Sequence, residues 1–123
     1  MGKELDQIIS LLHQTKELDP VFDYSIGYNK FGYATAIVWQ DSVMLGHAKL
    51  LLDVVMIDKT KRQQNSANWC YCGPCGITGD KKIACFVEAI MIAEEHQDYV
   101  FIMNSLYEKS GVDRSVTKLI FGD

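Results

Sequence analysis

The chain has 123 residues, of which 48% are hydrophobic and 23% are charged, and its net charge at pH 7 is −4. This composition is that of an ordinary soluble protein, and the length fits a single domain spanning residues 1–123. No apolar run approaches the roughly 18 residues of a membrane helix. The N-terminus opens with charges and lacks a signal-peptide core. We therefore expect a cytoplasmic protein, whose thiols stay reduced.

Two elements are predicted in the first third of the chain. Residues 3–18 form an amphipathic helix, because apolar residues recur there at helical spacing until Pro20 ends the pattern. Residues 21–40 form an antiparallel hairpin, because aromatic and β-branched residues alternate with small or polar ones on both sides of a turn at 29–32.

Residues 42–58 fit two patterns. Ser42 is a plausible helix N-cap, and apolar residues after it fall on one helical face. The nearly continuous apolar run from Leu50 to Ile57 suits a buried strand equally well. Helix and strand both stay open for this segment.

All four cysteines lie in one short stretch with the spacing C-x-C-x2-C-x9-C. Thiols so close in sequence can converge on one tetrahedral ion, and zinc with four thiolates is the commonest such site. The predicted ligands are Cys70, Cys72, Cys75 and Cys85. If Cys85 is not the fourth ligand, Asp80 or His96 could take its place. The metal would be structural, since four protein ligands leave no open position for chemistry.

The stretch Cys72–Gly76 has the form C-x-x-C-G, which is typical of a metal knuckle. Pro74 would fix φ inside a tight turn, and Gly76 would remove the Cβ where the chain bends. We therefore expect a turn here that presents Cys72 and Cys75 to the same ion.

Besides unrelated free thiols, which the clustering disfavours, two other interpretations of the cysteines stay open. Disulfides are one, with three possible connectivities for four cysteines. The other is a redox dithiol, because the segment Cys72–Cys75 resembles the active-site tetrad of thioredoxin; Cys72 would be the nucleophile and Cys75 the resolving thiol. The tetrad of thioredoxin follows a buried strand and opens a helix, whereas here a polar loop precedes it and glycines follow it.

The rest of the chain is predicted from its periodicity. Residues 81–96 form a helix with Cys85 about one turn in, residues 99–103 form a short strand, and residues 112–121 are weakly patterned. Together these elements predict an α+β fold in which an N-terminal helix, a hairpin and further helices pack on a small sheet.

Charge is unevenly spread along the chain. Residues 59–82 hold five basic residues against Asp80 alone, a balance of +4 that leaves −8 for the remainder. The basic residues are Lys59, Lys61, Arg62, Lys81 and Lys82. A zinc module that binds nucleic acid would place them on phosphates.

The motifs of several enzyme classes are absent from the sequence, among them the phosphate-cradling glycine loop, H-E-x-x-H and the nucleophile elbow. We therefore expect a binding protein without enzymatic activity. In size, acidity and cysteine content the chain is similar to the small phage anti-CRISPR metalloproteins that block a type II effector nuclease. The resemblance implies a cytoplasmic inhibitor that covers a basic, nucleic-acid-binding surface of its partner. The resemblance rests on no shared motif, so the candidate contacts are chosen for their clustered negative charge; they are Asp19, Asp23, Glu94, Glu95 and Asp98.

Overall fold

The computed structural model describes the backbone of residues 2–59 and 69–122. In these ranges the helices are α1 (Gly2–Leu18), α2 (Ser42–Leu51), α3 (His96–Ser110) and the short 3-10 helix η2 (Arg114–Val116). The strands are β1 (Asp23–Tyr28), β2 (Ala34–Gln40), β3 (Val54–Lys59), β4 (Cys70–Ile77), β5 (Ile83–Cys85), β6 (Glu88–Met91) and β7 (Leu119–Gly122).

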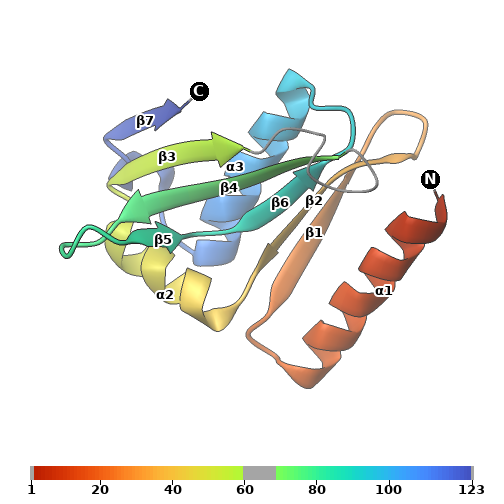
Figure 1. Ribbon diagram of the computed structural model, residues 1–123, viewed down its shortest axis with the longest axis horizontal. Helices are drawn as coiled ribbons and strands as arrows, with labels where there is room; N and C mark the ends of the chain where they lie inside the picture. The colour runs from red at the N-terminus through yellow and green to blue at the C-terminus, as the bar shows by residue number, and fades with distance from the viewer. Residues whose placement is uncertain (1, 60–68, 123) are drawn as a thin grey trace.

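The strands form one seven-stranded sheet in the order β1-β2-β6-β4-β3-β7, and β5 extends the sheet by pairing with β4 (Figure 1). Neighbouring strands are antiparallel except β3 and β7, which run parallel. The predicted α+β fold is therefore confirmed.

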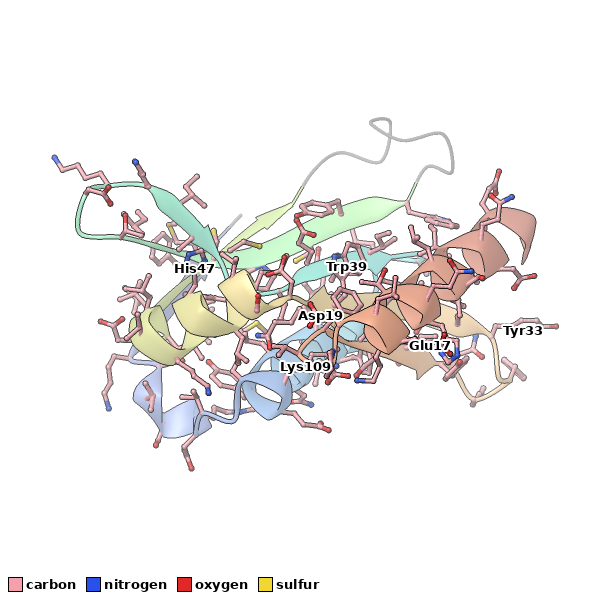
Figure 2. All side chains as sticks on the ribbon, turned by 90° about the horizontal axis from the view of Figure 1, so that it is seen from below. Glu17, Asp19, Tyr33, Trp39, His47 and Lys109 are labelled. Carbon is pink, nitrogen blue, oxygen red and sulfur yellow. The ribbon has the colours of Figure 1, made fainter. Side chains whose placement is uncertain are left out.

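The larger core lies between the sheet and helices α2 and α3. Side chains alternate across a strand, so every second residue of the central strands faces this side. Val38, Val55 and Ala89 are fully buried there, and Ile102 and Leu106 of α3 pack on them one helical turn apart. Figure 2 shows α2 and α3 together on one side of β3 and β4.

A smaller core lies on the opposite side of the sheet, at its β1–β2 end. Helix α1 runs beside β1 there (Figure 1). Leu12 of α1 packs against Phe22 and Ile37, with Trp39 at the margin of the cluster. Because the two cores cover both faces of β2, Ala36, Ile37 and Val38 are all fully buried in an unbroken run.

The N-terminal helix and the hairpin are confirmed with shifts of a few residues at their ends. The turn between β1 and β2 is held by Asn29, whose side-chain oxygen accepts backbone N–H groups of Phe31 and Tyr33 at 2.9 and 3.1 Å. The ambiguous segment 42–58 contains both candidates, helix α2 followed by strand β3. The N-cap of α2 is Asp41, not Ser42, and its carboxylate accepts the N–H of Met44 at 2.9 Å.

The predicted helix over 81–96 is wrong. This segment contains β5 and β6, which pair with β4 and β2. Phe86 and Val87 are both fully buried where the chain passes from β5 to β6, and they mask the alternation of exposed and buried residues. Over so short a run, that interruption imitates a helical period.

The predicted strand over 99–103 is also wrong, since these residues lie inside α3. A capping box begins this helix: Glu95 and Asp98 each bind the backbone of the other residue. The apolar run Tyr99–Met103 satisfies a strand pattern locally, but Ile102 and Leu106 show the helical spacing once the helix is extended to Ser110.

Gly76 sits where its strand meets the core. A Cβ added to this residue would lie 2.7 Å from the ring of Phe86, which is fully buried. We expect Gly76→Ala to lower the free energy of unfolding by about 1–3 kcal/mol, because the ring cannot retreat without strain. Urea denaturation measures the change.

Gly46 is the matched control, because it lies in α2 and a Cβ added to it would meet no atom within 4 Å. Gly46→Ala is expected to raise the free energy of unfolding by about 0.5–1 kcal/mol through helix propensity. Equal stability of the Gly76→Ala variant and the wild type would contradict the packing of β4 on Phe86.

Lys109 is a lysine whose side chain is only 3% exposed. Its Nζ donates to Asp23 Oδ2 at 3.1 Å and to Ser25 Oγ at 2.6 Å, which ties the end of α3 to β1. Burial alone would raise the pKa of Asp23, but the hydrogen bonds and charges of Lys109 and Lys16 outweigh it and hold the pKa below its ordinary value of 3.8.

A carboxylate whose pKa is lowered by folding stabilises the protein above its unfolded pKa, and this stabilisation is lost as the pH falls. We expect the melting temperature to drop as the pH falls below about 4, and Lys109→Ala to reduce that dependence. Lys49→Ala, at an exposed position of α2, is the control. An unchanged pH dependence of the melting temperature in Lys109→Ala would show that the pair does not stabilise the fold.

Candidate functional site

The four cysteines are divided between the two faces of the sheet. Cys70 and Cys72 belong to the core cluster beneath α2 and α3 and are at most 1% exposed. Cys75 lies an odd number of residues further along the same strand, so its side chain is on the opposite face. Cys85 pairs with Cys75 across β4 and β5 and shares that face.

The predicted knuckle turn is wrong, because Cys72–Gly76 is part of the extended strand β4. The turn prediction rested on glycine and proline, but here β3 pairs with residues 72–75 on one side of β4, and on the other side β6 pairs with residues 70–72 and β5 with residues 75–77. Pairing with neighbouring strands overrides the local preference of these two residues for a turn.

Pro74 lacks the N–H that a central strand normally donates. Phe86 N–H donates to Pro74 O at 2.9 Å, and the return bond from Pro74 to the carbonyl of Phe86 cannot form. The amide of Gln40, only 3% exposed, supplies the missing donor: its Nε2 lies 3.0 Å from Phe86 O and 3.0 Å from Ser110 Oγ. A buried glutamine thus compensates for a proline inside the sheet.

Cys72 and Cys75 both lie in the extended strand β4, which keeps them too far apart for the redox dithiol that the sequence suggested. Residues three apart in an extended strand are separated by roughly 10 Å between Cα atoms, and a disulfide spans at most about 7 Å. The structure therefore does not bring these two thiols together.

The four-cysteine zinc site stays a prediction. All four cysteines are thiols in the structure. Among the described residues, no group of three or more His, Cys, Asp or Glu side chains is placed to hold a metal ion. One ion bound by all four thiols would need ligands from both faces of β4.

The alternative fourth ligands lie elsewhere. Asp80 is exposed in the turn between β4 and β5, where it pairs with Lys82 at 3.7 Å. His96 is exposed at the first turn of α3.

Beside Cys75 and Cys85 lies a polar network that no sequence motif indicates. Glu88 accepts hydrogen bonds from Trp39 Nε1 at 2.8 Å and from the hydroxyl of Tyr71 at 3.1 Å. Figure 2 labels Trp39 near the middle of the sheet. Burial, together with the charge of Glu88, raises the pKa of Tyr71 well above its ordinary value of 10.0.

The same surroundings act on the Cys85 thiol. Burial raises its pKa, and the negative charges of Glu88, Cys75 and Asp41 add to the effect, giving a pKa of about 12. The thiol of Cys85 donates to the carbonyl of Val87 at 3.1 Å, and His47 Nδ1 contacts the carbonyl of Cys85, not its sulfur, at 3.2 Å. A protonated thiol among carboxylates lacks the lowered pKa of catalytic cysteines.

An apolar surface continues from this point to the edge of the sheet. Pairing across β7, β3, β4 and β5 aligns side chains in rows on the face that points away from α2 and α3. We call this surface the apolar sheet face; it consists of Val54, Met56, Ile77, Ile83, Leu119 and Phe121. Ile83 is 72% exposed and Leu119 is 54% exposed, so large apolar side chains stand in solvent in the described structure.

Strand β7 ends the sheet on this side. It pairs with β3 alone among the described strands, and all four of its residues are exposed. Lys118 directly precedes this short strand, but no charged residue or proline, the usual protection of an edge strand, occurs from Leu119 to Gly122. The opposite edge differs, because α1 runs beside β1 (Figure 1).

The acidic residues implied as partner contacts do not form one surface. Asp98 is 2% exposed and accepts the N–H of Glu95 at 3.1 Å, so it serves as a cap. Asp23 pairs with Lys16 of α1 and with Lys109 at the C-terminal end of α3, which lies roughly 17 Å along the helix from Asp98. Asp19 lies near Asp23 in sequence and accepts the N–H of Val21 at 3.0 Å, while Glu94 accepts the hydroxyl of Tyr99 at 3.1 Å.

The basic residues considered for nucleic-acid binding are only partly described. Lys81 and Lys82 are exposed in the turn between β4 and β5. Lys61 and Arg62 lie outside the described residues, as does the side chain of Lys59.

An open cleft of about 790 Å³ lies between the β1–β2 hairpin and the start of α3. Tyr28, Lys30 and Phe31 line it from the hairpin, and Gln97 and Phe101 line it from α3. The Lys30 ammonium sits 5.2 Å from the centre of the Phe31 ring, so cation and aromatic ring already interact with each other.

Comparisons with known proteins add no constraint on function. No protein-family model matches the chain, and neither a curated protein nor a solved structure shows significant similarity to it. Across the described helices, none combines the length and apolar character needed to cross a bilayer.

The role of Gln40 can be tested by a double-mutant cycle. We expect Gln40→Met to lower the free energy of unfolding by about 1–3 kcal/mol, because the buried carbonyl of Phe86 loses its donor. In the Pro74→Ala background, residue 74 regains an N–H for that carbonyl, so the same substitution should cost less.

Urea denaturation of the wild type, both single variants and the double variant measures the coupling. A Gln40→Met cost that is identical in both backgrounds would contradict the compensation of Pro74 by Gln40.

Proposed function

We propose that the protein is a non-enzymatic binding protein that receives an extended apolar segment of a protein partner on the apolar sheet face and along strand β7. The observation that carries the proposal is the exposure of large apolar side chains in contiguous rows next to an unprotected strand edge. Edge strands of this kind accept an added strand, with backbone hydrogen bonds supplying affinity and side-chain pockets supplying specificity.

The size of the surface supports this assignment. The exposed parts of its side chains sum to an apolar area on the order of 400–500 Å², which is within the range of patches that are often functional. A stable interface buries about 800 Å² on each partner. The strand edge and the polar residues around the patch would contribute the remainder.

One feature of the surface favours an extended ligand. A pocket of about 230 Å³ opens beside β7, with Leu51, Val54, Met56, Ile77 and Phe121 among its lining residues. A side chain from a strand added to β7 would point toward this pocket at every second residue. The partner segment is therefore expected to alternate apolar and other residues.

The surroundings of Cys85 support a function without catalysis. Its raised pKa keeps nearly all of the thiol protonated at neutral pH, whereas a catalytic cysteine that turns over many substrate molecules needs a lowered pKa. The effector-nuclease partner expected from the resemblance is one protein of the proposed class. It would have to be recognised through the apolar sheet face, because the implied acidic contacts are capped, paired or far apart.

The proposal is tested by selecting ligands from a displayed library of random peptides about ten residues long. Selected peptides should alternate apolar residues and slow amide hydrogen exchange in β7. Binding should weaken about tenfold or more for Ile83→Lys and Leu119→Lys, since each places a charge in the buried interface.

Leu18→Lys is the matched control, because Leu18 is 88% exposed at the end of α1, outside the apolar sheet face. Its affinity for the selected peptides should equal that of the wild type. Peptides that bind all three variants alike and leave β7 unprotected would contradict the proposed surface.

A further inference from the structure

Cys75 and Cys85 occupy a special position in the antiparallel pair β4–β5. Thr78 N–H donates to Lys82 O at 2.8 Å, and Phe86 N–H donates to Pro74 O at 2.9 Å. Hydrogen-bonded and non-hydrogen-bonded pairs alternate along an antiparallel ladder. The pairs 78/82 and 74/86 are hydrogen-bonded, so the pair Cys75/Cys85 between them is non-hydrogen-bonded.

This position brings two side chains as close as a sheet allows. Cα atoms of a non-hydrogen-bonded pair lie about 4.5 Å apart, and a disulfide requires roughly 4.4–6.8 Å. Both side chains share one face of the sheet, and residue Cys85 is partly exposed while Cys75 is 5% exposed.

The other two cysteines have no such neighbour in the described sheet. Cys70 lies opposite Met91, and Cys72 lies opposite Ala89 on one side and Lys59 on the other. Both are buried beneath the helices, on the face away from Cys75. The register therefore selects one cysteine pair from the connectivities that the sequence leaves open.

We propose that Cys75 and Cys85 are a redox modification site at which a low-molecular-weight disulfide, such as oxidised glutathione, forms an intramolecular disulfide between β4 and β5. The proposal does not depend on the proposed binding function. It assigns to the thiol pair a slow thiol–disulfide exchange, argued from the register and the partial exposure of Cys85; the exchange proceeds through the small thiolate fraction that the raised pKa of Cys85 leaves.

The reaction proceeds by two exchanges. Cys85 loses its proton and its sulfur attacks one sulfur of oxidised glutathione; a mixed disulfide forms and one glutathione leaves as thiolate. Cys75 then loses its proton and attacks the Cys85 sulfur, which releases the second glutathione. The two protein thiols give up two electrons and two protons, and oxidised glutathione becomes two reduced glutathione molecules.

The disulfide would close the β4–β5 hairpin around its turn at Thr78–Lys82. A cross-link over so short a loop reduces the entropy of the unfolded chain without bending the native strands, because the two residues already lie directly opposite each other in the register. Oxidation should therefore raise the melting temperature by roughly 5–10 °C.

The test incubates the full-length protein with oxidised glutathione at about pH 8 for several hours, since exchange of partly buried thiols is slow. Alkylation of the remaining thiols and peptide mapping should show Cys75 linked to Cys85, with Cys70 and Cys72 alkylated after unfolding. Thermal melts of the oxidised and reduced protein give the expected shift.

Two variants sharpen the test. Cys85→Ser should abolish the internal disulfide and the shift in melting temperature, whereas Cys70→Ala, its matched control, should retain both. Four thiols that stay reduced, a glutathione adduct that persists on Cys85, or a disulfide that includes Cys70 or Cys72 would each overturn the proposal.

Discussion

Strand β4 is held extended by hydrogen-bonded pairing with three other strands. Its neighbours β6, β3 and β5 fix the backbone of Cys70–Ile77 from both sides. The two-residue period then assigns each side chain to a face. Cys70 and Cys72 join the core under the helices, and Tyr71 and Cys75 turn to the opposite side. The cysteine chemistry and the apolar sheet face both follow from this division.

Side-chain hydrogen bonds of two residues distant in sequence, Gln40 and Glu88, hold β4 and its neighbouring strands together. Gln40, at the end of β2, replaces the hydrogen bond that Pro74 cannot donate, and Ser110 of α3 shares its amide. Glu88 of β6 accepts from both Trp39 and Tyr71. On the face of the sheet that points away from α2 and α3, helix α1 covers the β1 end. No helix in the described structure covers the β7 end of that face. That asymmetry is the reason to assign partner binding to the β7 end.

Periodicity and turn residues were enough to predict the elements that depend on contacts between residues close in sequence. The helix α1 and the hairpin carried clean periods and an Asn29 turn, and both are present. Segment 81–96 was predicted wrongly because Phe86 and Val87 are both buried, a consequence of strand pairing that no local pattern shows. The cysteine spacing predicted one shared metal site, but the face of each thiol depends on the register of β4 with β3, β5 and β6. Gln40 could be found only from the proline it compensates, 34 positions away in sequence.

The most direct measurement is the proton NMR contact between the Hα atoms of Cys75 and Cys85 in the reduced protein. Hα atoms of a non-hydrogen-bonded antiparallel pair face each other closely, so we expect a strong nuclear Overhauser effect between them, with strand-type shifts through Cys70–Ile77. Absence of this contact, together with turn-type shifts at Cys72–Cys75 and helical shifts over 81–96, would contradict the extended β4. That result would restore the knuckle in which all four thiols converge on one ion.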